Sequence, residues 1–142
     1  MGIPRETVRL EGELESPSMI APRSGEDWTS RMNTYSHKRS RELAEEDLSG
    51  FVFKKNSPSC GLFRVSVMQA NGMPIKKGRG LFGAEFTRRF PLVPCEEEGR
   101  LIDPRLRENF IERVFAFHRV KELFVGRWKR GNVVEFHSKE KY

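Results

Sequence analysis

The sequence has few cysteines and no long apolar run, and both shortages limit what the protein can be. Its 142 residues include two cysteines, Cys60 and Cys95, too few for a framework of disulfide bonds. In a reducing cytosol we expect free thiols or ligands rather than a bridge. No apolar stretch approaches the roughly 18 residues that a membrane-spanning helix needs. The N-terminus lacks the pattern of a secretory signal, so we expect a cytoplasmic protein without membrane contact.

Charged residues are plentiful, by contrast, and basic residues outnumber acidic ones. Charged side chains make up 32% of the chain and the net charge is +6, which leaves modest apolar material for a core. The excess of positive charge permits contact with nucleic acid or other polyanions. Basic and acidic residues are interleaved, however, so charge alone does not establish such a partner.

The hydrophobic pattern predicts helices and strands in alternation. Proline and glycine punctuate the first 27 residues, which are predicted to be loop apart from a short extended piece at 8–10. A helix is expected at 28–47, where Trp28, Met32, Tyr35, Arg39 and Leu43 recur at helical spacing. The remaining predicted elements are strands at 51–53 and 63–67, an edge strand at best at 73–77, and helices at 81–90, 104–125 and from about 132.

This order of elements is typical of α/β proteins. We therefore predict an α/β fold with a Rossmann-like partial sheet flanked by helices, followed by a C-terminal helical segment. The predicted division is a partial α/β domain at 1–101 and, at 102–142, a long helix with the start of a helical domain.

The most informative segment is Ser57-Pro58-Ser59-Cys60-Gly61. It follows a predicted buried strand directly, where open α/β sheets place their ligand sites. A thiolate there would face a cleft, and the serine hydroxyls and free backbone N–H groups would hydrogen-bond a sulfur atom or an anion. The alternative is a small buried cysteine in a tight turn, because free cysteine is among the most buried residue types.

Residues 54–61 resemble the LKxxSPSCG signature of the bacterial desulfurase family typified by 2-thiouracil desulfurase. Other segments also resemble parts of this family, and residues 117–138 resemble the opening of a helical domain often fused behind it. Those other segments are 2–6, 23–29, 78–82 and 96–101.

The resemblance implies a [4Fe-4S] cluster held by three cysteines, of which only Cys60 matches a position in this chain. The other two would fall upstream of Met1. Three thiolates leave one iron open, as in the open position of a catalytic zinc, and a thiocarbonyl sulfur is a soft ligand suited to that iron. The implied reaction removes sulfur from a thiolated nucleobase or similar thioamide.

The resemblance also supplies candidate site residues besides the metal ligand Cys60. The catalytic candidates are Ser57, Ser59, Glu6 and Asp27, since proton transfer needs a carboxylate or hydroxyl near the substrate. Asp27 has a plain alternative as a helix cap. The substrate-binding candidates are Arg5, Thr29, Lys54 and Gly61.

Because two expected cysteines are missing, we expect a fragment that binds no stable cluster and has little or no activity. Two alternatives stay open. One is a broken reading frame without a function of its own. The other is a non-catalytic module that binds nucleotide or RNA phosphates through the basic residues Lys76, Lys77, Arg79, Arg88 and Arg89.

Those basic residues surround a glycine pattern, Gly78-Arg79-Gly80-Leu81-Phe82-Gly83, that matches G-x-G-x-x-G. A dinucleotide site would need a buried strand just before this pattern, and the preceding residues form a poor strand. A glycine turn into a helix is therefore favoured. The three histidines, His37, His118 and His137, are too scattered to indicate a metal site.

Overall fold

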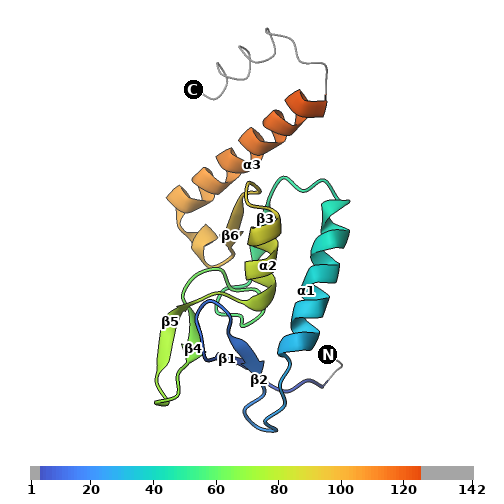
Figure 1. The fold of residues 1–142 in the computed structure, drawn as a ribbon. Helices are drawn as coiled ribbons and strands as arrows, with labels where there is room; N and C mark the ends of the chain where they lie inside the picture. Colours follow the sequence, from blue (N-terminus) through green and yellow to red (C-terminus); the bar gives the residue numbers. More distant parts are fainter. Residues whose placement is uncertain (1–3, 126–142) are drawn as a thin grey trace.

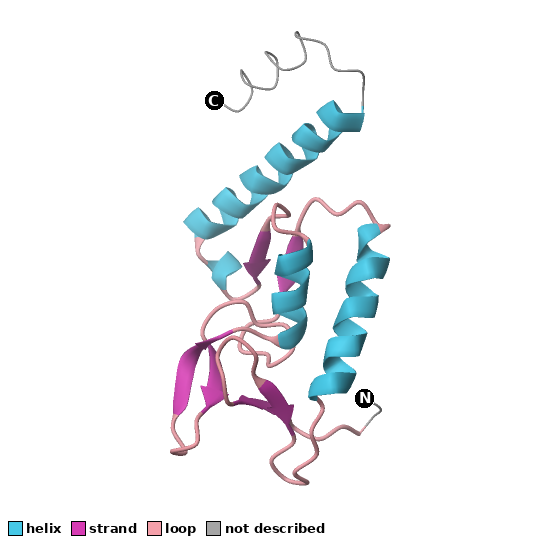
Figure 2. Cartoon of the chain, in the orientation of Figure 1, coloured by secondary structure: helices cyan, strands magenta, loops and turns pink. Residues whose placement is uncertain are grey.

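The structure is a computed structural model that describes residues 4–125. It contains two small sheets and three α-helices (Figures 1 and 2). The predicted α/β class with a C-terminal helix is confirmed. The helix expected from about residue 132 lies outside the described residues.

The larger sheet has four strands in the order β2-β1-β4-β5. β1 and β4 pair in parallel at its centre, and each pairs with its outer neighbour in antiparallel fashion. Pro74 opens β5, which lies at the sheet edge as predicted, because proline has no N–H to donate to a ladder. The bounds are β1 Arg9–Glu11, β2 Ser18–Ile20, β4 Val65–Met68 and β5 Pro74–Gly78.

The smaller sheet is a parallel pair of β3 (Phe51–Phe53) and β6 (Cys95–Glu97). Helices α1 (Thr29–Ala44) and α2 (Leu81–Arg89) lie side by side (Figure 1). A short 3₁₀ turn at Arg100–Ile102 leads into α3 (Pro104–Val125) at the far end of the molecule. No helix within the described residues is long and apolar enough to cross a membrane.

Two elements differ from the sequence-based expectation. β1 overlaps the extended piece expected at 8–10, but β2 forms in a stretch that was predicted to be loop, and the two strands bury Leu10 and Met19. Each strand has only three residues, so the alternation of apolar and polar positions is too short to recognise. β6 was not predicted at all, because two of its three residues are glutamates.

The interior consists of two hydrophobic clusters. One joins the four-stranded sheet to α2 through Leu10, Met19, Val65, Val67 and Leu81. The other contains Leu43, Phe53, Leu62, Phe82 and Phe86, with Phe51 and Phe90 packed against it. α2 contributes to both clusters, so this helix joins the two sheets. The segment with Cys60 connects β3 to β4 and lies beside the second cluster.

Candidate functional site

The loop from Asn56 to Arg64 holds Cys60, and internal hydrogen bonds shape it. The hydroxyl of Ser57 accepts hydrogen bonds from the backbone N–H groups of Ser59, at 3.3 Å, and Cys60, at 3.1 Å. The carbonyl of Ser57 accepts a third from Gly61 N–H, at 2.8 Å. The expectation that these N–H groups stay free for a ligand is therefore wrong, since the loop uses them itself.

The start of α2 packs directly on this loop. The backbone N–H groups of Gly80 and Leu81 donate to the carbonyls of Gly61 and Pro58, while those of Phe82 and Gly83 both donate to Ser59. The first N–H groups of a helix have no partner within the helix, so the loop carbonyls satisfy them. These donors are consequently not available to an anion.

Close packing also explains the glycines of the G-x-G-x-x-G pattern. A Cβ atom on Gly80 would lie 2.4 Å from the carbonyl carbon of Ser59, and one on Gly83 would lie 3.1 Å from the Cys60 carbonyl oxygen. These glycines let α2 approach the backbone of the loop. The favoured interpretation, a glycine turn into a helix, is confirmed, and α2 begins at Leu81.

The thiol of Cys60 is half-buried and lines a cavity of about 550 Å³. α1 contributes one side of this cavity, because its residues at helical spacing turn the same face toward the loop. Phe51 and Phe82 come from β3 and α2, and Arg5 comes from the N-terminal segment. The full lining is Arg5, Trp28, Arg31, Met32, Tyr35, Arg39, Leu43, Phe51, Ser59, Cys60 and Phe82.

The charged groups around the cavity are all arginines, and two of them have partners. The Arg31 guanidinium stacks on the Trp28 ring, 3.5 Å from its centroid, and pairs with Glu26. Arg39 pairs with Glu42 at 3.0 Å. Within residues 4–125, no hydrogen bond or ion pair engages the guanidinium of Arg5. The cavity therefore presents aromatic faces together with one uncompensated positive charge.

Four of the candidate site residues lie at or beside Cys60. Ser59 and Arg5 line the same cavity, and the Ser59 hydroxyl lies 3.5 Å from the Cys60 sulfur and 3.0 Å from the Ser57 hydroxyl. Ser57 shapes the loop from within. Gly61 is needed for packing, because a Cβ there would lie 2.4 Å from the Val65 side chain and 2.9 Å from the Ser57 carbonyl oxygen.

The other four candidates do not line the cavity. Glu6 is exposed and accepts a hydrogen bond from Ser24, at 2.6 Å. Thr29 instead lines a second cavity on the other side of α1, and its hydroxyl accepts a hydrogen bond from Met19 N–H, at 2.8 Å. Lys54 is exposed and pairs with Glu98 at 3.3 Å.

Asp27 takes the plainer role of fixing the turn into α1. Its carboxylate accepts a hydrogen bond from Thr29 N–H, at 2.8 Å. Hydrogen bonds from the Thr29 side chain and then its backbone lower the pKa of Asp27 below the ordinary value. A carboxyl group with a lowered pKa is ionised at neutral pH, so it is a poor proton donor there.

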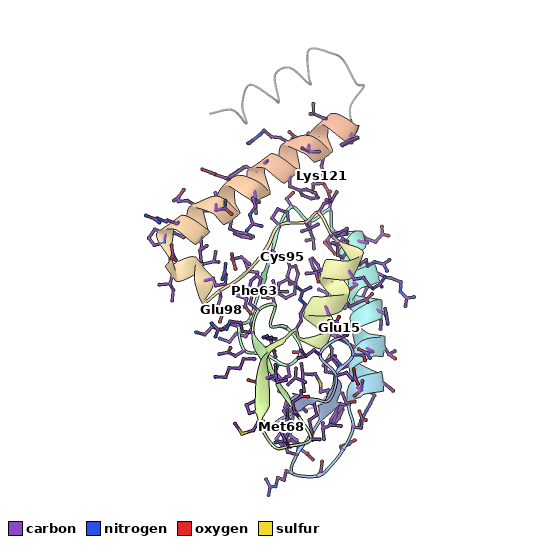
Figure 3. The ribbon with its side chains drawn as sticks, turned by 60° about the vertical axis from the view of Figure 1, so that its left-hand side comes forward. Glu15, Phe63, Met68, Cys95, Glu98 and Lys121 are labelled. Atoms are coloured by element: carbon purple, nitrogen blue, oxygen red, sulfur yellow. The ribbon has the colours of Figure 1, made fainter. Side chains whose placement is uncertain are left out.

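The second cysteine lies in a different environment from the first. Cys95 begins β6, and its thiol donates to the Val93 carbonyl at 3.3 Å (Figure 3). Burial raises the pKa of this thiol to about 11. Among residues 4–125, no three His, Cys, Asp or Glu side chains lie close enough together to hold a metal ion. The two thiols of this chain therefore do not by themselves fit a cluster that needs three cysteines.

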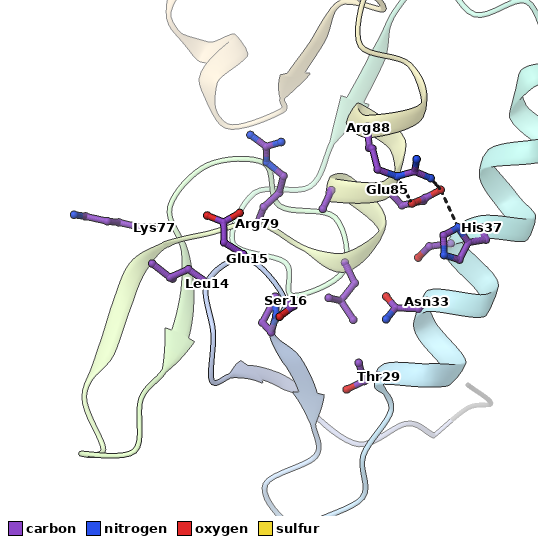
Figure 4. A pocket seen from close by; sticks show the side chains of 14 residues that line it. Leu14, Glu15, Ser16, Thr29, Asn33, His37, Lys77, Arg79, Glu85 and Arg88 are labelled. Atoms are coloured by element: carbon purple, nitrogen blue, oxygen red, sulfur yellow. Dashed lines mark hydrogen bonds and ion pairs between the residues drawn. The ribbon is translucent and has the colours of Figure 1, made fainter.

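The second cavity, of about 720 Å³, lies between α1, α2 and the loop that joins β1 to β2 (Figure 4). Lys77, Arg79 and Arg88 line it together with Glu15 and Glu85, so the charges largely compensate one another. Hydrogen bonding from Arg88 lowers the pKa of Glu85 despite the opposing effect of burial, and His37 adds to this shift. His37 lies 2.9 Å from the Glu85 carboxylate.

Sequence reasoning identified the stripe on α1 but not its role. Trp28, Met32, Tyr35, Arg39 and Leu43 were recognised as one helix face, and this face lines the Cys60 cavity. Arg39 among the apolar and aromatic residues could have indicated a ligand cavity, because charged side chains are rare on helix faces that are packed into a core. The buried glutamates of β6, Glu96 and Glu97, gave no signal.

The family comparison agrees with the segment that carries this site. A model of the 2-thiouracil desulfurase family matches residues 1–98, a range that includes Cys60 and its whole cavity. The comparisons with curated proteins and with solved structures gave no match. Because the matched range is well over half of the 142 residues, the chain belongs to the 2-thiouracil desulfurase family.

Proposed function

We propose that the Cys60 cavity is the substrate site of a desulfurase that acts on a thiolated nucleobase or a similar thioamide. The observation that carries this proposal is the position of Cys60, which packs beside the aromatic cluster and lines a cavity together with aromatic residues and arginines. A buried cysteine in a tight turn would not line a cavity, so the geometry supports the functional interpretation of the loop over the packing one.

The cavity suits a flat, polar ring. Its volume of about 550 Å³ falls within the range of roughly 300 to 1,000 Å³ that is usual for ligand sites. Tyr35, Phe51 and Phe82 provide apolar faces against which a nucleobase can lie, whereas the Arg31 guanidinium already covers one face of Trp28. The free guanidinium of Arg5 can donate to the oxygen or ring nitrogen of such a base. A thiocarbonyl group would then face the Cys60 sulfur.

Ser59 is the residue that we assign to the handling of sulfur. Its hydroxyl lies 3.5 Å from the Cys60 sulfur and 3.0 Å from the Ser57 hydroxyl. One hydroxyl can donate one hydrogen bond and accept others. Ser59 can therefore donate to a thiolate at Cys60 while it accepts from Ser57, which would hold the thiolate in place.

We further propose that Cys60 supplies one thiolate to a [4Fe-4S] cluster, which when bound provides a soft, sulfur-binding iron. The two thiols of this chain do not complete such a cluster, because the Cys95 thiol is bonded to a carbonyl and its pKa is raised to about 11. The remaining ligands would have to come from outside this chain. On this proposal the isolated chain binds no stable cluster and has little or no desulfurase activity.

The substrate site is tested by protection from alkylation. The chain is treated with iodoacetamide in the presence of 2-thiouracil or uracil, and modification of Cys60 and Cys95 is measured separately by peptide mass spectrometry. We expect 2-thiouracil to slow modification of Cys60 more than uracil does. Arg5→Gln should weaken this protection, whereas Arg23→Gln, a change outside the cavity lining, should preserve it. Equal rates at Cys60 with and without 2-thiouracil would contradict the proposed site.

The cluster is tested by iron and sulfide analysis after anaerobic reconstitution of the isolated chain. We expect well under one cluster per chain. A stoichiometric [4Fe-4S] cluster on this chain alone, retained through gel filtration, would show that two cysteines suffice with other ligands.

A binding module for nucleotide or RNA phosphates is the second candidate. The observation that favours it is that Lys77, Arg79 and Arg88 all line the cavity of about 720 Å³ (Figure 4). Glu15 and Glu85 offset this charge, and the N–H groups at the start of α2 are engaged. Affinity for RNA that falls steeply with salt and is unchanged by Cys60→Ala would favour this candidate.

A further inference from the structure

A buried carboxylate reaches the Cys60 loop from the last residue of β6. The side chain of Glu97 is almost fully buried, with 4% of its surface exposed. Its carboxylate oxygen accepts hydrogen bonds from the backbone N–H groups of Leu62, at 2.9 Å, and Phe63, at 3.5 Å. These are the second and third residues after Cys60, so the bonds hold the loop where it leaves the cysteine.

The partners of Glu97 distinguish it from the glutamate beside it. Glu96 is equally buried, but its carboxylate pairs with Arg100 at 2.7 Å. Within residues 4–125, the carboxylate of Glu97 makes no ion pair, so the loop N–H groups are its compensation. A buried carboxylate is costly unless other groups satisfy it. The loop N–H groups satisfy the buried carboxylate of Glu97, and the carboxylate in turn satisfies these N–H groups.

The next residue holds the other end of the same loop. Glu98 accepts a hydrogen bond from Lys55 N–H, at 2.8 Å, and its side chain is partly exposed (Figure 3). The start of α2 holds the middle of the loop through the carbonyls of Pro58, Ser59 and Gly61. Glu97 is the side chain among these attachments that holds the loop after the cysteine, at Leu62 and Phe63.

We propose that Glu97 is a positioning residue for Cys60, which fixes the exit of the loop and thereby directs the thiol into its cavity. The inference rests on the proposed function only in treating Cys60 as the working thiol. The carboxylate does not touch substrate; it acts through the backbone of Leu62 and Phe63.

Glu97→Gln and Glu96→Gln form a matched pair of variants for the test. Both remove the charge of a buried glutamate from β6, but only the first weakens a bond to the Cys60 loop. The rate of iodoacetamide modification is measured for each cysteine at one fixed pH, without substrate or cluster. Cys95 is partly buried in the same strand as both glutamates, and its thiol donates to a carbonyl. It serves as the internal reporter of general unfolding.

We expect Cys60 to react about threefold faster or more in Glu97→Gln than in Glu96→Gln, because hydrogen bonds to a charged acceptor are stronger than those to an amide. The rate at Cys95 should be the same in the two variants. Equal Cys60 rates in the two variants, or a parallel rise at both cysteines in Glu97→Gln, would overturn the proposal.

Glu97→Asp provides a milder variant in case the glutamine variant does not fold. Aspartate keeps the charge, but its side chain is one methylene shorter, so the carboxylate lies farther from the loop N–H groups. We therefore expect the same faster reaction at Cys60. An unchanged rate would again overturn the proposal. No arm of this test needs thiouracil. Failure here with intact 2-thiouracil protection would therefore leave the proposed substrate site standing.

Discussion

At the scale of single residues, the two cysteines show how neighbours decide what a thiol can do. Cys60 lies in a loop beside a serine hydroxyl and opens into a cavity. Cys95 lies in a strand, donates to a carbonyl and has its pKa raised to about 11 by burial. A thiol is reactive only as the thiolate, so Cys95 is inert at neutral pH.

The raised pKa of Cys95 predicts a loss of stability at high pH. The unfolded chain releases the proton near the ordinary value of 9.0, whereas the folded chain retains it up to about 11. The stabilising contribution of this thiol is therefore complete below pH 9 and is lost as the pH rises toward 11. Urea unfolding at pH 8 and pH 10.5 should show a smaller decrease in stability for Cys95→Val than for the native chain. An identical decrease would contradict the raised pKa.

The sequence predicted the residues of the site better than it predicted their roles. The S-P-S-C-G segment identified Cys60, Ser59 and the loop, because serine, proline and glycine mark a turn by their local chemistry. It did not show that Glu6 and Thr29 would lie outside the cavity. Placement of this kind depends on strand pairing between distant residues, which leaves no local trace in the sequence.

At the scale of secondary-structure elements, the contact between α2 and the Cys60 loop depends on glycine. Gly80 has an ordinary extended backbone, with φ of −61°, so the requirement there is for space and not for an unusual conformation. A Cβ would meet backbone atoms of Ser59 and Cys60 at 2.4 to 2.7 Å. Backbone atoms cannot move aside as the end of a flexible side chain can.

Gly80→Ala is accordingly predicted to separate α2 from the loop. We expect a loss of about 1–3 kcal/mol in the free energy of unfolding, as for overpacked cores, together with faster alkylation of Cys60. Gly12→Ala is the control, because its added Cβ meets no atom within 4 Å although φ is 95°. That control should be strained locally but leave the Cys60 rate unchanged. Urea unfolding and the alkylation assay measure the two effects, and an unaltered Cys60 rate in Gly80→Ala would contradict the contact.

Element boundaries were predicted well where the chemistry of one residue sets them. Asp103 and Pro104 correctly marked the start of α3, because aspartate caps helices and proline suits the first helical position. The Asp103 carboxylate accepts a hydrogen bond from Arg105 N–H, at 2.8 Å. By contrast, α1 ends at Ala44, three residues before the predicted end, because Asp47 has φ of 50° and cannot continue the helix.

At the scale of the whole molecule, α2 contributes residues to both cores, and α1 adds Met32 to one and Leu43 to the other. Leu81 belongs to the cluster of the four-stranded sheet, whereas Phe82 and Phe86 belong to the aromatic cluster around β3. Phe86 is fully buried, and its ring contacts those of Phe51, Phe53 and Phe90 at centroid distances of 4.5 to 5.3 Å. Both cores therefore depend on one helix of nine residues.

This arrangement predicts a single cooperative unfolding transition. Phe86→Ala should reduce the free energy of unfolding by about 3–5 kcal/mol, as is typical for a phenylalanine removed from a core. Circular dichroism and amide exchange at Val67, in the other core, should report the same lower stability in this variant. If Val67 kept its original protection while the aromatic cluster opened, the two cores would be independent units.

The predicted α/β class was confirmed, but its details exceed what periodicity can show. The division into residues 1–101 and 102–142 stays a prediction. β2 and β6 have three residues each, and both form by pairing with another strand, β2 with β1 and β6 with the distant β3. Sequence patterns predict that a glutamate such as Glu97 is exposed. Only the fold shows the backbone N–H groups that donate hydrogen bonds to its buried carboxylate.

The internal bonding of the Cys60 loop has a consequence for engineering. The N–H groups of residues 59–63 are already bonded to Ser57 and Glu97, so a guest beside Cys60 must be recognised by side chains. Five of those side chains, from Trp28 to Arg39, stand at the beginning of α1 or along its length. Ligand selectivity can therefore be changed by substitutions on one face of α1. The loop that holds Cys60 is a different segment and would not need to change.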